Sequence, residues 1–320
     1  MTTSMPLTAI ANPDDARAAL KASIEALDTI ILGKTTQIKL AVSCLLANGH
    51  LLIEDVPGVG KTTMARALAR VLGLDFARVQ FTSDLLPADI TGISVYQKDS
   101  GEFRFLEGPV FTQMLLADEI NRATPKAQSA LLEAMQEQQV TVDGQAYSLP
   151  DPFFVVATQN PADQIGTFAL PESQLDRFLL RVQLGYPTPE FERVLLSGQH
   201  QSQSLDSVPA ALTPAGIDTL KSLAQQVKLS EPLLDYVQAL LNYTRDSGLF
   251  VHGLSPRAGI ALTAAARAFT LIEERNAVYP EDIQQVFAAL AGHRLNAAGD
   301  NRHVSTSELV ASVLDAVPIP

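Results

Sequence analysis

Cysteine is almost missing from this sequence: Cys44 is the single cysteine among 320 residues. A chain with one cysteine forms no internal disulfide, which fits a reducing compartment, so we expect a cytoplasmic protein. Cys44 lies in the apolar run AVSCLLA and is most simply a small core residue.

Positive charge is scarce as well. Lys and Arg number 23 against 35 Asp and Glu, which gives a formal net charge of −12. An extended basic groove is therefore excluded, because the backbone phosphates of a nucleic acid would be repelled. We expect no nucleic-acid partner, although a local basic pore stays compatible with this charge.

Long apolar runs are absent too. No uninterrupted run approaches the roughly 18 residues that a membrane helix needs, so we expect no direct membrane insertion. The N-terminal stretch MTTSMPLTAIANPDD has no basic segment followed by an apolar one, and a signal peptide is not expected. Residues 1–14 are predicted to form a loose tail.

What the chain does contain is enough apolar sequence for a sizeable core, with 47% hydrophobic and 18% charged residues. Its length favours two domains. Predicted strands alternate with helices up to residue 187, and everything after that reads as helical. We therefore predict an α/β domain over 1–187 and a helical domain over 188–320.

A glycine-rich run, EDVPGVGKTT at 54–63, lies between a predicted strand at Leu51–Ile53 and a predicted helix at Thr62–Leu72. A strand, a glycine loop and a helix in this order form a cradle for phosphates, because the free N–H groups of the loop and of the first helical turn point at an anion. The sequence thus predicts a nucleoside triphosphatase.

Each side chain of the loop has an expected role. Gly58 and Gly60 allow the tight turn, Lys61 would reach the β- and γ-phosphates, and Thr62 would place its hydroxyl on Mg²⁺. Asp55 stands where the usual pattern has glycine, which is tolerable if its side chain points away from the phosphates or bonds the loop itself. The predicted ATP-binding residues are Pro57, Gly58, Val59, Gly60, Lys61, Thr62 and Thr63.

Polar residues follow two further apolar strands. Asp118 and Glu119 come after the run Leu115–Ala117, and Asn160 follows Phe153–Ala157. Asp118 would hold Mg²⁺ through water, Glu119 would orient or deprotonate the attacking water, and Asn160 would contact the γ-phosphate and that water. Taken singly, two acids are also a common helix start, and Asn160 a turn residue.

Two arginines complete the candidate site. Arg177, before a strand predicted near 178–184, lies too far along the fold to serve its own nucleotide, but it fits an arginine finger supplied to a neighbouring subunit. A salt bridge to Asp176 or Glu172 is the alternative. Arg257, at the first turn of a helix, could fold down onto the phosphates, or it could be an ordinary solvated arginine. His50 is read as a loop residue.

Outside the sheet, two β-hairpins are predicted, at 93–106 and at 138–150, the second with an Asp143-Gly144 turn of type I′. In the helical half, capping residues before proline mark helix starts at Thr188, Thr213 and Ser255, and Ser305 to Glu308 forms a capping box. Residues 199–212 read as a connecting loop.

These elements together resemble the MoxR family of AAA+ ATPases from about residue 25 to the end. The resemblance is carried by long runs: VQFTSDLLPADITG (79–92), LLADEINRATPKAQSALLEAMQE (115–137), VTVDG (140–144), ATQNP (157–161), LPESQLDRFLL (170–180) and GLSPRAG (253–259).

The resemblance implies a P-loop αβα sandwich with a parallel sheet, two hairpin inserts that face a pore or a partner, and a helical lid. It also implies a ring, usually a hexamer, with ATP bound between subunits. By position, Lys61 and Thr62 match Walker A, Asp118 and Glu119 Walker B, and Asn160 sensor 1. Arg177 matches the arginine finger and Arg257 sensor 2, which would link the nucleotide state to the lid.

The implied activity is ATP hydrolysis that remodels, matures or metal-loads an unidentified client protein, with a partner carrying a von Willebrand factor A domain. Two alternatives stay open: the ATPase subunit of a chelatase-like complex, and a nucleotide-gated scaffold with little turnover. A DNA motor is disfavoured by the acidic composition.

Overall fold

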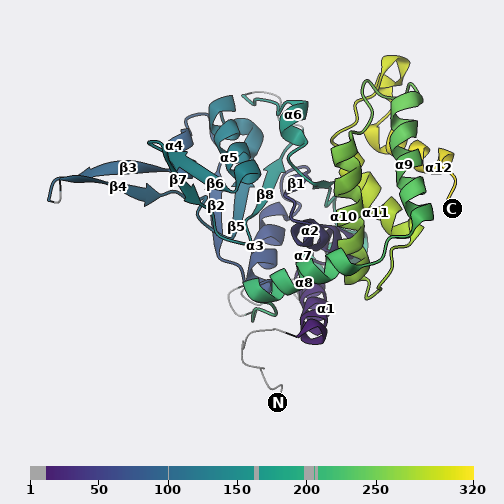
Figure 1. Ribbon diagram of the computed structural model, residues 1–320, viewed down its shortest axis with the longest axis horizontal. Helices are drawn as coiled ribbons and strands as arrows, with labels where there is room; N and C mark the ends of the chain where they lie inside the picture. The colour runs from purple at the N-terminus through teal and green to yellow at the C-terminus, as the bar shows by residue number, and fades with distance from the viewer. Residues whose placement is uncertain (1–11, 100, 162–165, 198–204, 206–207) are drawn as a thin grey trace.

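The computed structural model describes residues 12–99, 101–161, 166–197, 205 and 208–320. Most of the predicted N-terminal tail and much of the predicted loop at 199–212 lie outside these residues. Figure 1 shows a central sheet wrapped by helices, with a long hairpin projecting on one side and a bundle of helices on the other.

The central sheet is parallel and has the strand order β2-β5-β8-β1-β9. Its register aligns polar residues at one edge: Gln80 pairs with Asp118, and Glu54 with Gln159. This is the edge at which parallel sheets bind ligands. The strands are β1 (Leu51–Glu54), β2 (Phe76–Gln80), β5 (Met114–Asp118), β8 (Phe154–Gln159) and β9 (Leu180–Val182).

Alternate residues of these strands enter two different apolar layers. In β5, Leu115 and Ala117 pack into one buried cluster while Met114 and Leu116 pack into the other. A strand buried on both faces needs a largely apolar sequence, which is why β5 and β8 lack the polar alternation seen in β2. The αβα sandwich expected from the sequence is therefore confirmed.

The helices of the first half of the chain flank the central sheet. The first two helices, over 13–30 and 35–46, are separated by a turn that contains Gly33, whose φ is +69°. These helices are α1 (Pro13–Ile30), α2 (Thr35–Leu46), α3 (Lys61–Val71), α4 (Pro87–Thr91), the short 3-10 helix η1 (Ile120–Arg122), α5 (Pro125–Glu137) and α6 (Glu172–Leu175).

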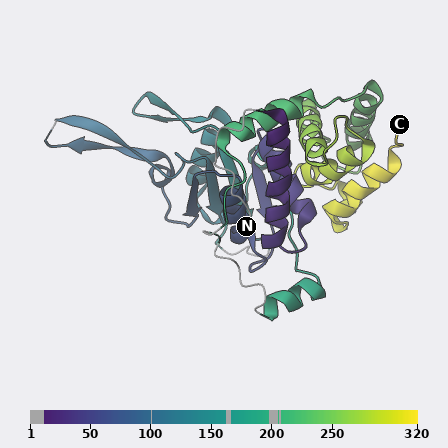
Figure 2. The same cartoon turned by 90° about the horizontal axis from the view of Figure 1, so that it is seen from below.

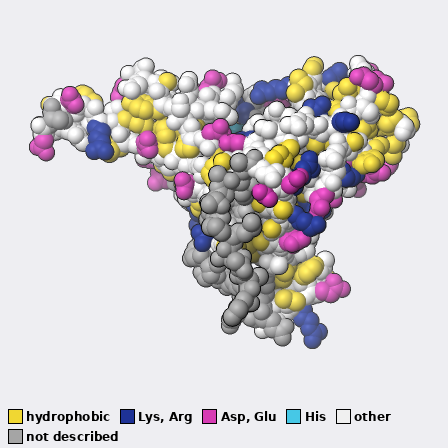
Figure 3. Space-filling view, turned by 60° about the horizontal axis from the view of Figure 1, so that its bottom comes forward, with side chains coloured by type: hydrophobic (Ala, Val, Ile, Leu, Met, Phe, Trp, Pro, Cys, Tyr) yellow, Lys and Arg dark blue, Asp and Glu magenta, His cyan; other side chains and the backbone are white. Residues whose placement is uncertain are grey.

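Both predicted hairpins are present. One joins β3 (Gly92–Gln97) to β4 (Glu102–Glu107), and the other joins β6 (Gln139–Val142) to β7 (Gln145–Ser148). The φ angles of Asp143 (+51°) and Gly144 (+80°) are both positive, as a type I′ turn requires. The β3–β4 hairpin forms a projecting arm with apolar side chains along it (Figure 3).

The second half of the chain is helical, as predicted. Thr213, Ser255 and Ser305 each accept a backbone N–H at their helix starts, whereas no side-chain capping bond forms at Thr188 in the described part of the chain. Helix α7 lies apart from the bundle (Figure 2). The helices are α7 (Pro189–Leu196), α8 (Pro214–Gln226), α9 (Glu231–Asp246), α10 (Pro256–Ile272), α11 (Pro280–Ala291), the 3-10 helix η3 (Gly299–His303) and α12 (Thr306–Ala316).

One of these helix starts is capped in a way that the sequence did not predict. No good cap precedes Pro280, yet the Oδ2 atom of Asp282 accepts the backbone N–H of Tyr279 at 2.9 Å. Asp282 is buried and also pairs with Arg275. The capping side chain therefore belongs to the first turn of α11 itself.

The apolar core does not divide between residues 187 and 188. Buried side chains of α1 and α2 share one cluster with those of α8, α10 and α11. The division into 1–187 and 188–320 thus stays a prediction. Among the described residues, no helix combines the length and the apolarity needed to cross a membrane.

Candidate functional site

The P-loop joins β1 to α3 through two glycines in left-handed conformation. Gly58 has φ +85° and Gly60, which caps α3, has φ +95°. A Cβ atom added at either glycine would meet no atom within 4 Å in the described part of the chain. Glycine is therefore favoured by backbone conformation rather than by crowding, and the open space beside the loop is available to a ligand.

Lys61 folds back over this loop. Its Nζ atom donates to the backbone oxygens of Asp55 and Gln159, the latter at 3.1 Å. These carbonyls lie at the ends of β1 and β8, so the ammonium sits at the strand edge where phosphates would be bound.

Asp118, the last residue of β5, lies beside the P-loop. Its Oδ2 atom accepts the Thr62 hydroxyl at 3.3 Å, and its Oδ1 atom accepts the Thr158 hydroxyl at 2.6 Å. The side chain is only 9% exposed. A carboxylate and a hydroxyl this close can share one hydrated divalent cation.

Glu119 adopts φ +56°, a conformation that a non-glycine residue takes only at a cost. Its backbone N–H donates to Thr158 Oγ1 at 2.8 Å, which stabilises this turn. Its Oε2 atom accepts from Gln80 Nε2 at 2.9 Å and from Arg122 Nη1 at 3.0 Å. The carboxylate is thus held by side chains of β2 and η1.

These residues share one pocket of about 390 Å³. Asn160, which is buried, lines it at the end of β8. Of the predicted ATP-binding residues, Val59 is not among the lining residues, and its side chain packs on the core instead. The pocket is lined by Pro57, Gly58, Gly60, Lys61, Thr62, Thr63, Arg78, Gln80, Asp118, Glu119 and Asn160.

Two residues of this pocket were missed by the sequence analysis. Arg78 Nη2 and Nε donate to Asp118 Oδ2 at 2.8 and 3.2 Å, and Gln80 holds Glu119. Both belong to β2, at positions two residues apart that share a face. The available signal was the pair of long polar side chains near the end of a strand beside the one that carries Asp118.

Asp55, the departure from the usual loop pattern, bonds the loop and a neighbouring segment. Its Oδ1 atom accepts the N–H of Val56 at 2.8 Å, and its Oδ2 atom accepts the N–H of Gly185 at 2.6 Å. The side chain therefore ties the P-loop to the chain beyond β9.

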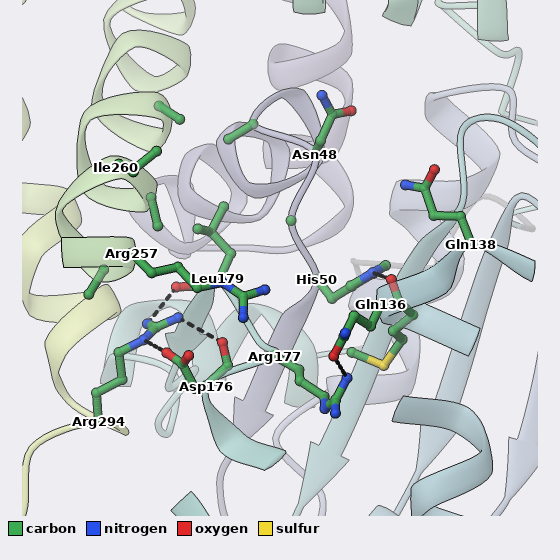
Figure 4. A pocket seen from close by; sticks show the side chains of 16 residues that line it. Asn48, His50, Gln136, Gln138, Asp176, Arg177, Leu179, Arg257, Ile260 and Arg294 are labelled. Atoms are coloured by element: carbon green, nitrogen blue, oxygen red, sulfur yellow. Dashed lines mark hydrogen bonds and ion pairs between the residues drawn. The ribbon is translucent and has the colours of Figure 1, made fainter. Parts of the chain in front are cut away.

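Arg177 and Arg257 lie in a second pocket of about 340 Å³ together with Arg294 (Figure 4). Arg177 Nη1 donates to the Leu132 carbonyl at 3.1 Å and to the Gln136 amide oxygen. Neither carboxylate proposed as its salt-bridge partner holds it in the described structure. Asp176 is paired with Arg294, and Glu172 accepts from Asn296.

The predicted site residues thus fall into two groups. Among the residues that the structure describes, neither Arg177 nor Arg257 lines the P-loop pocket of its own chain. The structure does not bring the two arginines to the phosphate cradle within one subunit.

His50 lies in the short loop before β1, as predicted, and its side chain is buried against β8 and α5. Its Nδ1 atom accepts the Val155 N–H at 3.0 Å, and Nε2 donates to the Met135 carbonyl at 3.3 Å. Burial lowers the pKa of His50 to about 4, so the ring is neutral and structural at pH 7.

Comparisons with known proteins agree with this geometry. Residues 50–180 match the ATPase family associated with various cellular activities (AAA), and residues 242–313 match the AAA lid domain. The chain is 38% identical over 314 residues to the chaperone MoxR1 of Mycobacterium tuberculosis, spanning 94% of this chain and 82% of that protein. The protein MoxR of Paracoccus denitrificans is 31% identical over 337 residues, or 97% of this chain and 98% of the relative.

The chain belongs to the MoxR family of AAA+ ATPases. Two further similarities extend over nearly the whole length. The uncharacterized protein YeaC of Bacillus subtilis is 42% identical over 313 residues, or 97% of this chain and 98% of YeaC. The crystal structure of a proposed ATPase from Cytophaga hutchinsonii superimposes with a TM-score of 0.87 at 35% identity, covering 96% and 97% of the two chains. The MoxR fold thus includes the lid as well as the nucleotide domain.

Proposed function

We propose that this MoxR-family chain hydrolyses ATP at sites shared between neighbouring copies of itself. The cycle remodels, matures or metal-loads a client protein complex. The observation that carries the proposal is the convergence of Lys61, Thr62, Asp118, Glu119 and Asn160 on one pocket. The name of one relative, a chaperone, supports work on a client.

The residues present fit MgATP. The first turn of α3 after Gly60 presents a helix N-terminus to the phosphates, and Lys61 supplies the positive charge. No cluster of three or more His, Cys, Asp or Glu residues suited to a metal occurs in the described ranges. Mg²⁺, held by Thr62 and through water by Asp118, would take its other ligands from phosphate and solvent, as this cation usually does.

Hydrolysis would then depend on residues that line the same pocket. ATP would supply the electrophilic γ-phosphate, and Mg²⁺ would neutralise part of the phosphate charge. Glu119 takes the proton of the attacking water, and Asn160 orients that water with a neutral amide. Before the reaction Glu119 must exchange its bonds to Gln80 and Arg122 for one to water.

A shared site accounts for the second pocket. Arg177 and Arg257 both line it, and neither lines the P-loop pocket of its own chain in the described structure. An arginine finger supplied by a neighbour raises hydrolysis rates by about 10³–10⁵. We propose that both arginines face the nucleotide of the next subunit in a ring, which we expect to be hexameric, and that Arg257 reports the nucleotide state to the lid.

The work on a client would fall to the hairpins and to a partner. The β3–β4 arm exposes apolar side chains, including Phe103 at 73%, which suits contact with a protein. We propose a protein with a von Willebrand factor A domain as the partner. A scaffold with little turnover is disfavoured by the intact Glu119, and a chelatase-like subunit by the MoxR relatives.

The test is ATP hydrolysis measured against protein concentration, with mass determined in parallel, for wild type, Glu119→Gln and Arg177→Ala. We expect the rate per chain to rise with assembly and to be lost in both variants, while each still binds nucleotide. Robust turnover by a demonstrable monomer would contradict the shared site. Binding without turnover at any concentration would favour the scaffold or a missing partner, and the measurement is then repeated in the presence of a candidate partner that carries a von Willebrand factor A domain.

A further inference from the structure

Arg294 follows α11 in the lid and reaches across to the segment that carries Arg177 (Figure 4). Its Nε atom donates to Asp176 Oδ1 at 2.7 Å, and Nη2 donates to the carbonyls of Phe178 at 2.7 Å and Asp176 at 3.3 Å. Nη1 donates to the carbonyls of Leu179 at 3.0 Å and Leu290 at 2.7 Å.

This set of bonds uses the whole guanidinium. Arginine carries five N–H donors, and each has an acceptor here, one on the lid helix and the others on residues 176–179. The side chain is 8% exposed, so each bond forms away from water, where a lost partner is costly. A lysine in its place would have three donors at a single point.

The bonded residues flank Arg177 on both sides. Asp176 precedes it, Phe178 follows it, and the neighbouring His293 adds a bond to the Phe178 carbonyl at 2.9 Å. Asn296 holds Glu172 further upstream, at 2.6 Å. The backbone around Arg177 is therefore fixed to the lid, whereas the Arg177 side chain is held only by Leu132 and Gln136 of the α5 region in the described structure.

We infer that Arg294 is a positioning residue that aims Arg177 at the nucleotide of the neighbouring subunit and couples that aim to the lid. This inference rests on the shared site proposed above. Arg257, in α10 of the same lid, lines the same pocket, so one clamp sets the relative placement of both arginines. A merely structural Arg294 would instead stabilise its own subunit and leave the effect of Arg177 and Arg257 on ATP hydrolysis unchanged.

The experiment mixes inactive variants of the full-length chain and asks which pairs recover ATP hydrolysis. Lys61→Ala subunits lack a working nucleotide site but keep Arg177. Arg177→Ala subunits lack the finger but keep the nucleotide site. Mixed rings of these two must recover activity if the site is shared, because some interfaces then pair an intact nucleotide site with an intact finger.

Arg294→Lys is then mixed with each of these two variants, to decide whether it has lost the nucleotide site or the finger. We expect a loss of about 10²-fold in kcat with the KM for ATP little changed, as for a catalytic group displaced by about 1 Å. Mixing with Lys61→Ala must restore turnover, and mixing with Arg177→Ala must not. Asp176→Asn, which weakens the same clamp from the other side, must fall in the same group with a smaller loss.

Arg275→Lys is the matched control, since Arg275 pairs with the buried Asp282 inside the lid and is bonded to no residue of the 176–179 segment in the described structure. It should keep its turnover even if its Tm falls. The inference is overturned if Arg294→Lys stays active, is rescued by Arg177→Ala, or is rescued by neither partner while Asp176→Asn stays active. If Lys61→Ala and Arg177→Ala themselves do not complement, the shared site fails, and the inference falls with it.

Discussion

The two carboxylate oxygens of Asp118 accept hydrogen bonds from different partners. Oδ1 accepts the buried Thr158 hydroxyl, while Oδ2 faces the pocket and is shared by Thr62 and Arg78. A cation entering beside Thr62 must compete with the Arg78 guanidinium for Oδ2. The ion pair is half exposed on the arginine side, so solvent weakens it.

At this residue scale, we expect Arg78→Ala to lower the Mg²⁺ concentration that gives half-maximal ATP hydrolysis. A half-exposed ion pair contributes at most about 1 kcal/mol, so the shift should be no more than about fivefold. Magnesium titrations of the rate check this. Arg122→Ala, which removes a partner of Glu119 instead, should leave the Mg²⁺ midpoint unchanged, and an equal shift in both variants would contradict the competition.

His50 makes the stability of the fold depend on pH. Its pKa in the folded chain, about 4, lies below the ordinary value of 6.5, so the unfolded chain takes up the proton first. The contribution of neutral His50 to the free energy of unfolding is complete above pH 6.5 and is lost as the pH falls toward 4. Between pH 7.5 and 5.5 we expect His50 to account for about 1 kcal/mol of lost unfolding free energy.

His50→Gln tests this because its amide can accept from Val155 and donate to Met135 while carrying no titratable group. Urea unfolding at the two pH values should show a smaller loss in the variant. His293, whose pKa burial also lowers, keeps responding in both proteins. An identical loss of unfolding free energy in wild type and variant would contradict this contribution of His50.

At the scale of elements, the β3–β4 hairpin has an anchored base and an exposed end. Phe105 stacks on Tyr147 of the second hairpin with ring centroids 4.1 Å apart and meets Phe111 edge-on at 5.5 Å. Phe103, two residues earlier on the same face, contacts only Tyr96 among described aromatic rings. The two hairpins are thus joined through one aromatic side chain.

Phe105→Ala should detach the base of the arm, at a cost of about 1 kcal/mol for the lost ring pairs beyond the buried area. We expect faster amide hydrogen exchange over 92–97 and 102–107 in this variant. Phe103→Ala is the control on the same strand and should leave exchange at the base unchanged. Equal acceleration by both substitutions would contradict the anchor.

Elements also show what the sequence could predict. The P-loop residues and Asp118 could be placed together because parallel strands present their C-terminal ends at one edge, whatever the rest of the fold does. Arg78 could not, since nothing in FARVQ tells which face of β2 meets Asp118. The pocket that holds Arg257 depends on how α10 packs against α2 and α8, a tertiary arrangement that no local pattern encodes.

At the scale of the whole molecule, the helical second half of the chain shares its core with the first helices. Leu20 and Leu27 of α1 belong to the same buried cluster as Ile217 and Leu220 of α8. We expect a fragment of residues 188–320 to unfold without a cooperative transition, because it lacks the helices against which α8 and α10 pack. Circular dichroism melts of the fragment and the full chain check this, and a sharp two-state melt of the fragment would contradict it.

The same packing has a consequence during synthesis. Helix α1 ends at Ile30 and its partner α8 begins at Pro214, so roughly 180 residues are translated between them. At the usual 5–20 residues per second, the part of the apolar face of α1 that packs on α8 stays uncovered for roughly 10 to 40 s. The part of α1 that α8 covers is thus buried late, after α2 and α3, which also contact α1, have been made, and it is a face of the nascent chain that a holding chaperone could protect.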